Sequence, residues 1–191
     1  RLLARRILST FAENRYVVVP SGSCAVMMRM FYPELFQDDP ALLRQAQELS
    51  AKVYEFSEFL VKVLGVEDLG ASCTDTVTYH PGCHQLRGLE VRDEPLSLLR
   101  QVGGLELRDL PQAASCCGFG GAFSVKFPHI SEGMLSDKVK NVMSTGADTL
   151  VSCDMGCLMH IGGALRRQGS SIRVQHLAQV LDRKAGSPPA D

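Results

Sequence analysis

The sequence predicts an α/β protein whose parallel sheets form two similar halves, the first of them incomplete. Three observations support this fold class. Segments with helical periodicity alternate with short β-branched runs, clustered cysteines follow several of those runs, and one order of elements occurs twice. Because alternating strands and helices are typical of parallel sheets with crossover helices, we expect two Rossmann-like halves related by an internal repeat.

The N-terminal part is predicted to be mainly helical around one strand. Apolar residues recur at the helical period over residues 2–14. The run Tyr-Val-Val-Val-Pro at residues 16–20 predicts a short buried strand, and the Ser-Gly-Ser-Cys that follows predicts a loop and a helix N-cap. Further helices are predicted at residues 25–31 and 40–64, the second with a break near residues 55–57.

The C-terminal part alternates more regularly. Strands are predicted at residues 75–79, 105–110, 149–152 and 172–174. Helices are predicted at residues 94–101, 128–145, 157–168 and 175–183. Pro95 suits the first turn of its helix, and Gly146 closes the longest one.

An internal repeat relates residues 2–26 to residues 135–159 without a gap. Each copy runs through an amphipathic helix, a strand, a loop with cysteine and a helix, and Cys24 aligns with Cys157. Units of this kind are common enough to match by chance, but the matching cysteine favours a repeat. We therefore predict a remnant of the first half, a complete second half and a disordered tail, at residues 1–70, 71–184 and 185–191. We also expect that the chain lacks an N-terminal portion carrying another cysteine pair.

Five cysteines in loops near predicted strands are the strongest functional signal. They are Cys83, Cys116, Cys117, Cys153 and Cys157. The neighbours Cys116 and Cys117 direct their side chains apart, which suits two iron atoms of a cluster better than one small ion. Three interpretations stay open: an iron–sulfur cluster, a single zinc ion, or thiols that only shape loops. Cys73 has no partner pattern, and we interpret it as an incidental thiol.

Composition narrows the class of protein. The chain has seven cysteines, a net charge of −1 and no secretory-type N-terminal segment, so we expect a cytoplasmic protein with reduced thiols. The balanced charge gives no field for nucleic acid or anionic membrane. No apolar run approaches the roughly 18 residues of a transmembrane segment. Tryptophan is absent and aromatic residues make up 6% of the chain, so stacking platforms for bases are not expected.

The order of the cysteines and the segments around them resemble the CCG cysteine-rich domain family. The matching segments are PSGSC at residues 20–24, LFQDDP at 35–40, CCGFGGAFSVK at 116–126 and GCLMHIGG at 156–163. The family includes the cysteine-rich subunit of heterodisulfide reductase and the iron–sulfur subunits of glycolate oxidase and anaerobic glycerol-3-phosphate dehydrogenase. It also includes proteins of lactate utilisation, which these segments resemble most.

The resemblance implies an iron–sulfur redox subunit of an oxidoreductase that takes part in the oxidation of L-lactate to pyruvate. Its implied partners are other subunits of a lactate-oxidising complex, among them a ferredoxin-like iron–sulfur protein. A cluster-based subunit of the heterodisulfide reductase type is the alternative that the resemblance leaves.

The resemblance also implies a ligand set. In heterodisulfide reductase, five cysteines of the motif hold a non-cubane [4Fe-4S] cluster, and the last two are spaced C-x-x-C. Carried over, the five cysteines named above hold the cluster. Here Cys153 and Cys157 stand one residue further apart, which makes Cys153 the least secure ligand. Cys157 also matches Cys24, the remnant of the first site.

Residues beside the cysteines suit an anionic cluster. Three glycines that let backbone N–H groups approach sulfur follow the pair: Gly118, Gly120 and Gly121. His80 and His84 flank Cys83 and could ligate metal, carry protons or cap a loop; of the two, we assign His84 to the candidate site. Lys126 and Arg87 are candidate cations that would raise the reduction potential of a cluster.

Overall fold

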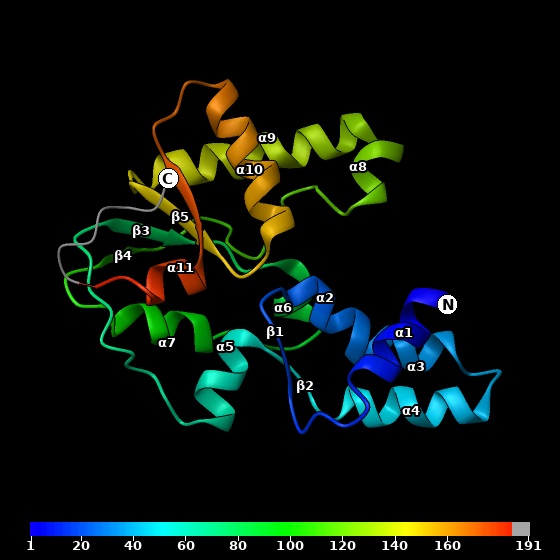
Figure 1. Ribbon diagram of the computed structural model, residues 1–191. Helices are drawn as coiled ribbons and strands as arrows, with labels where there is room; N and C mark the ends of the chain where they lie inside the picture. Colours follow the sequence, from blue (N-terminus) through cyan, green and yellow to red (C-terminus); the bar gives the residue numbers. More distant parts are fainter. Residues whose placement is uncertain (185–191) are drawn as a thin grey trace.

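Two parallel sheets organise residues 1–184, the part of the chain that the computed structural model describes (Figure 1). The disordered tail predicted at residues 185–191 lies outside the described residues. Within them, a small sheet pairs β1 with β2, and a larger sheet has the order β4-β3-β5-β6. The strands are β1 (Val17–Val19), β2 (Val53–Glu55), β3 (Thr76–Tyr79), β4 (Glu106–Arg108), β5 (Thr149–Ser152) and β6 (Arg173–His176). The predicted α/β class with parallel sheets is confirmed.

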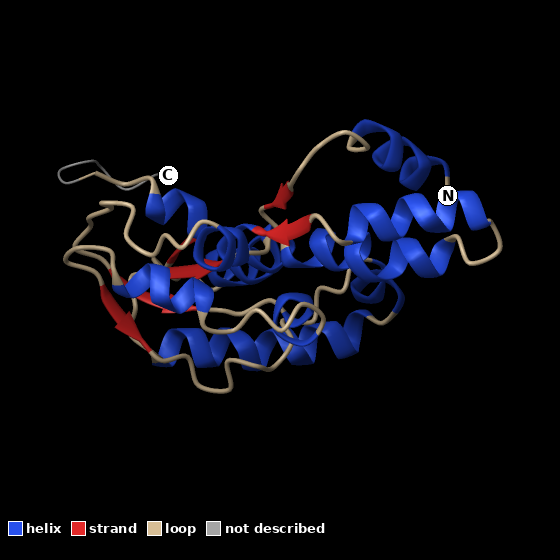
Figure 2. Cartoon of the chain, turned by 90° about the horizontal axis from the view of Figure 1, so that it is seen from below, coloured by secondary structure: helices blue, strands red, loops and turns tan. Residues whose placement is uncertain are grey.

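Helices connect these strands and extend the small-sheet end of the molecule. Around the small sheet they are α1 (Leu2–Thr10), α2 (Gly22–Val26), η1 (Met27–Phe31), α3 (Tyr32–Leu35), α4 (Pro40–Ser50), α5 (Phe56–Glu58) and η2 (Phe59–Val63), where η marks a π-helical turn. Around the larger sheet they are α6 (Cys83–Arg87), α7 (Glu94–Arg100), α8 (Ala122–Lys126), α9 (Pro128–Ser144), α10 (Met155–Arg167) and α11 (Leu177–Leu181). Figure 2 shows the helices of the N-terminal part reaching away from the larger sheet toward one end of the molecule.

The larger sheet carries helices on both faces. Helices α9 and α10 lie above it in Figure 1, and α7 and α11 lie below. The two cores follow the alternation of side chains along a strand: Val151 packs toward α7 and α11, whereas Leu150 packs toward α9 and α10. The chain leaves β3 toward β4 on one side and places β5 on the other, so a topological switch point lies between β3 and β5. Open α/β sheets bind ligands beyond the carboxyl ends of strands at such a point.

The helix predicted over residues 40–64 was wrong at residues 51–55, whereas residues 56–63 beyond the predicted break are helical. Helix α4 ends at Ser50, and residues 53–55 form strand β2, which pairs in parallel with β1. Val53 is buried in the core of the N-terminal part. A strand of three residues shows too little alternation to be separated from a helix by periodicity, so only the pairing with β1 reveals it. Helix α6, which begins at Cys83, was also not predicted.

The two sheets repeat the same unit. Strand β1 pairs with β2 through Val19 and Glu55, and β5 pairs with β6 through Ser152 and His176. Val19 and Ser152 are equivalent positions in the predicted alignment. In both units the last strand residue also caps the helix that follows: Glu55 caps α5 and His176 caps α11. The repeat therefore extends beyond the predicted segments to the second strand and helix of each unit.

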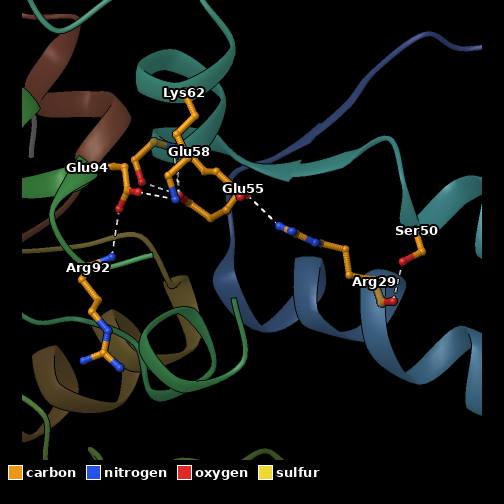
Figure 3. Close-up of polar contacts among 8 residues, drawn as sticks. Arg29, Ser50, Glu55, Glu58, Lys62, Arg92 and Glu94 are labelled. Carbon is orange, nitrogen blue, oxygen red and sulfur yellow. Dashed lines mark hydrogen bonds and ion pairs between the residues drawn. The ribbon is translucent and has the colours of Figure 1, made fainter. Parts of the chain in front are cut away.

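Polar contacts join the two parts of the chain (Figure 3). Lys62 Nζ lies 2.5 Å from Glu94 Oε1 across the boundary predicted at residue 70, and Arg29 Nη1 donates to Glu58 Oε2 at 2.7 Å within the N-terminal part. Apolar packing also crosses that boundary, because Leu89 belongs to the core of the N-terminal part and Leu60 packs on the core of the larger sheet. The division at residue 70 stays a prediction about the repeat; the packing is continuous there.

We expect Asp75→Asn to lower the free energy of unfolding at neutral pH by about 1–3 kcal/mol, because the change leaves buried Arg183 without its counter-charge. Asp75 Oδ2 lies 2.5 Å from Arg183 Nη1 and 2.9 Å from Arg173 Nη2. Partial burial raises the pKa of Asp75, but hydrogen bonds from Arg183 and Arg173 outweigh it and hold the pKa below its ordinary value.

A lowered pKa in the folded state gives stability that is present above the unfolded-state value, about 3.9 for aspartate, and is lost as the pH falls through the folded-state value. Urea unfolding of wild type and Asp75→Asn should therefore differ most near pH 7, with the difference shrinking in acid. A difference that is constant with pH would contradict this account.

No helix among residues 1–184 is both long and apolar enough to span a membrane.

Candidate metal centre

A cavity of about 520 Å³ lies where the carboxyl ends of strands from both sheets meet. The loops after β1, β3, β4 and β5 all contribute to its wall. The cysteines that line it are Cys24, Cys83, Cys116, Cys117 and Cys157. Met27, Phe31 and Met155 also line it and are exposed to solvent, so the cavity has an apolar margin at the surface.

The Asp154 carboxylate joins the two halves at this cavity. Its Oδ1 accepts hydrogen bonds from the N–H groups of Gly156 (3.0 Å) and Cys157 (3.4 Å), which caps α10. Its Oδ2 accepts from the Ser23 N–H at 3.1 Å and from Ser21 Oγ at 3.4 Å, at the start of α2. One buried carboxylate therefore fixes two helix N-termini, one from each half.

Cys24 and Cys157 occupy equivalent positions in the two halves. Ser21 caps α2 as Asp154 caps α10, and each cysteine is the third residue of its helix. The interface between the halves is close, because a Cβ on Gly22 would lie 2.7 Å from the Gln85 Cβ on α6. The structure thus agrees with the predicted register of the repeat, and it places Cys24 on the wall of the same cavity as the second-half thiols.

Four thiols of the second half form two contacting pairs. Cys83 and Cys116 place their sulfurs 4.0 Å apart, and Cys117 and Cys157 place theirs 3.3 Å apart. All seven cysteines of the chain are free thiols. Cys116 and Cys117 are neighbours in the chain, and they contact thiols of two different segments. The prediction that they bind two iron atoms stays a prediction.

The contacts between the thiols shift their pKa values in opposite directions. Contacts with Cys117 and Cys83 lower the pKa of Cys116, whose sulfur also accepts the Gly118 N–H at 3.3 Å. The pKa of Cys83 and that of Cys117 are raised, first by their hydrogen bonds with Cys116 and then by further contacts and burial. The pairs therefore favour a thiolate at Cys116, and a thiolate is the form that binds metal.

His80 lies on the buried side of the thiols. Its side chain is 1% exposed, and a ring nitrogen, Cys117 Sγ and Cys157 Sγ all lie within 4.8 Å of one another. Burial is the main reason that the pKa of His80 falls to about 3, so the ring is neutral. Sequence reasoning gave preference to His84, which lines the cavity but is exposed.

Comparison with known proteins identifies the family of this chain. The family model of the CCG cysteine-rich domain matches residues 77–162. Lactate utilization protein A of Shouchella clausii is 54% identical over 181 residues, which are 95% of this chain and 75% of the relative. The proteins of the same name from Bacillus subtilis and Bacillus velezensis are 50% and 52% identical over 178 residues, 93% of this chain and 74% of each relative. This chain belongs to the lactate utilization protein A family.

Among solved structures, a hypothetical protein from Helicobacter pylori matches 82% of this chain and 32% of its own, with a TM-score of 0.49 and 11% identity. The fold assignment of this member of the lactate utilization protein A family depends on the strand order instead.

The structure separates Cys153 from the other predicted ligands. Its side chain is fully buried with Tyr79, whose hydroxyl lies 3.5 Å from Cys153 Sγ, and Cys153 does not line the cavity. Burial, and then the nearby Glu55 carboxylate, raise the pKa of Cys153 well above its ordinary value. The cause of its placement is the strand alternation, since Cys153 follows Val151 by two residues and points to the same face. Cys73 packs near the same core, away from the cavity.

Lys138 is a buried cation close to the thiols. The sequence analysis named Lys126 and Arg87 instead. Lys138 Nζ donates to the carbonyl oxygens of Gln112 (3.0 Å) and Ala113 (3.1 Å), in the loop before Cys116. Burial lowers its pKa, whereas Cys117, Cys116 and Cys157 act to raise it. Lys126 is exposed, and Arg87 donates to the Ala114 carbonyl oxygen at 3.0 Å. Helical periodicity could have predicted that Lys138 is buried, because it lies three residues after Leu135 on the same face of α9.

The residues present fit a thiophilic metal group. Soft thiolates together with imidazole select iron–sulfur clusters or zinc over hard cations such as Mg²⁺. Cys83, Cys116, Cys117 and Cys157 would hold such a group, with Lys138 balancing their charge. Gly120 and Gly121 line the cavity with positive φ angles of 51° and 56°, so this loop takes a path that most residues avoid.

We expect Gly118→Ala to disrupt the thiol cluster. Gly118 has φ of 86°, and an added Cβ would lie 2.6 Å from the Ser131 carbonyl oxygen. The left-handed backbone alone costs a side chain about 1–2 kcal/mol, and the clash must be relieved by moving the loop that carries Cys116 and Cys117. Titration with Co²⁺, followed by thiolate-to-metal absorption, should show affinity at least about tenfold weaker than wild type. Gly133→Ala, at a helical position where the new Cβ would meet nothing within 4 Å beyond the backbone of its own helix, is the control.

Proposed function

We propose that this protein is an iron–sulfur redox subunit that takes part in the oxidation of L-lactate to pyruvate. The single observation that carries the proposal is the convergence of Cys83, Cys116, Cys117 and Cys157, from the segments that follow β3, β4 and β5, on one cavity. Membership of the lactate utilization protein A family supports lactate as the substrate of the pathway. A [4Fe-4S] cluster, non-cubane or cubane, would supply one-electron chemistry when bound.

The residues of the chain provide the environment for electron transfer. The paired thiols supply soft ligands, and the neighbouring Lys138 ammonium and the Gly118 N–H stabilise negative charge on sulfur. Such contacts raise the reduction potential of a cluster. The exposed side chains of Met27, Phe31 and Met155 leave the cavity close to the surface, within reach of a partner subunit. We propose a ferredoxin-like iron–sulfur protein as that partner, receiving the two electrons that leave lactate as it loses two protons.

Two other functions have some support. A single zinc ion is favoured by the grouping of His80, Cys117 and Cys157 within 4.8 Å. A disulfide-reducing subunit is favoured by the cavity itself, which would admit a small thiol beside the cysteines.

The test is the metal content after anaerobic reconstitution, measured as iron and acid-labile sulfide per chain together with an EPR spectrum. About four of each with a paramagnetic signal on reduction supports the proposal. Colourless protein that holds zinc and no iron contradicts it. With the partner subunits present, the cluster absorbance should bleach on addition of L-lactate and not of a heterodisulfide.

A further inference from the structure

The buried imidazole of His80 has no partner within the protein. Among the described residues, neither Nδ1 nor Nε2 of His80 has a hydrogen-bond partner, although the side chain is 1% exposed. Buried polar groups in folded proteins are nearly always paired, because an unpaired one costs about 1–3 kcal/mol. An orphaned buried imidazole therefore indicates a partner that the polypeptide does not supply.

The surroundings of His80 identify the kind of partner. A ring nitrogen lies within 4.8 Å of both Cys117 Sγ and Cys157 Sγ, and these two sulfurs are 3.3 Å apart. Two thiols and one imidazole around a common point are a donor set for a soft or borderline metal ion.

Strand geometry holds His80 in this position. Its N–H donates to the Val151 carbonyl oxygen at 2.8 Å, so His80 continues strand β3 along β5. Tyr79 and Val77 point into the core on the α7 and α11 face, and the alternation turns His80 to the opposite face, where Cys117 and Cys157 lie. The same alternation turns Cys153 away. His80 thus stands at the thiol cluster in the place that cysteine spacing assigns to Cys153.

We propose that His80 is a direct ligand, through one ring nitrogen, of the metal group held by Cys83, Cys116, Cys117 and Cys157. The inference rests on the proposed function in requiring a metal group at these thiols, and it adds an imidazole to the ligand set in place of Cys153. It holds for an iron of a cluster and for a single divalent ion. A histidine ligand donates a neutral nitrogen where cysteine donates an anionic sulfur, so the site carries one negative charge fewer and a higher reduction potential.

The experiment uses the full chain labelled with ¹⁵N-histidine, loaded anaerobically with iron and sulfide in one sample and with Co²⁺ in another. Iron and sulfide content tests the proposed function, and ¹⁵N hyperfine coupling in pulsed EPR tests the ligand. We expect strong ¹⁵N coupling of directly bound nitrogen, retained in His129→Gln and absent in His80→Gln. His129 is the matched control, since it is an exposed histidine of α9 that does not line the cavity.

The His80→Gln variant should bind Co²⁺ at least about tenfold more weakly than wild type, whereas His129→Gln should change the affinity less than twofold. Because His80 is buried, the circular dichroism spectrum of the metal-free variant checks that it folds. The His80→Cys variant supplies a substitute ligand, and a ligand role predicts recovered affinity with stronger thiolate-to-cobalt absorption. A structural role predicts no recovery.

The outcomes separate the two proposals. Iron and sulfide bound without ¹⁵N coupling would support the cluster and overturn the role of His80. Co²⁺ bound with ¹⁵N coupling but no iron uptake would overturn the proposed function and support His80 as a ligand of a single ion. Failure to bind either metal would overturn both.

Discussion

The Cys117→Ser variant is expected to retain almost none of the iron and sulfide that the wild-type chain takes up, a fall from about four of each toward zero. Cys117 is 2% exposed, and its sulfur is 3.3 Å from that of Cys157. A serine hydroxyl does not ionise near neutral pH and is a hard ligand, so it replaces thiolate poorly at an iron–sulfur site. Chemical assay of iron and sulfide per chain, with EPR after reduction, measures the loss.

The matched control is Cys73→Ser. Cys73 is a half-buried thiol that packs near the α7 and α11 core, away from the cavity, and the variant should take up as much iron as wild type. Because Cys157 lines the cavity and Cys153 does not, Cys153→Ser should retain more iron than Cys157→Ser. Full cluster content in Cys117→Ser would contradict the proposal that the adjacent cysteines Cys116 and Cys117 both hold the cluster.

The Asp154→Ala variant should lose about 2–4 kcal/mol in the free energy of unfolding and should also bind metal more weakly. Loss of a helix cap costs about 0.5–2 kcal/mol, and each further donor left without its charged partner adds to that. The change frees the N–H groups of Gly156 and Cys157 and also that of Ser23. Urea unfolding measures the first effect and Co²⁺ titration the second.

Two further variants test whether the effect is specific to the Asp154 carboxylate. Asp154→Asn keeps an oxygen for one helix but turns an amide NH₂ toward the other, so it should recover part of the stability. Asp137→Ala removes an exposed carboxylate that pairs with Lys140 on the surface, and surface pairs contribute little. If Asp137→Ala destabilises the protein as much as Asp154→Ala, the carboxylate between the two halves has no special role.

Much of the fold followed from the sequence because its signals are local. Alternating periodicity indicated parallel strands with crossover helices, and the alignment of Cys24 with Cys157 anticipated their equivalent places in α2 and α10. Strand β2 was missed, since a segment of three residues is identified by its pairing with β1 rather than by its own pattern. The unpredicted helix α6 lies against α2, where Gly22 allows the close approach.

The candidate site, like the fold, was predicted from the sequence only in part. Clustered cysteines at the ends of predicted strands were sufficient to indicate a candidate metal centre. The choice between His80 and His84 depended on which face of β3 meets α9 and α10, and so did the separation of Cys153 from Cys157. Strand alternation offered that information, but only once the helices covering each face were known.

By itself the sequence determined the α/β class, the repeat of the helix–strand unit and the presence of clustered thiols, because periodicity and residue spacing act over short segments. The tertiary structure alone decided that Asp154 joins two helix N-termini, that Lys138 lies behind the thiols and that His80 faces Cys117 and Cys157. These contacts link residues distant in the chain. They arise from the packing of two sheets whose carboxyl ends meet, and no local pattern specifies that packing.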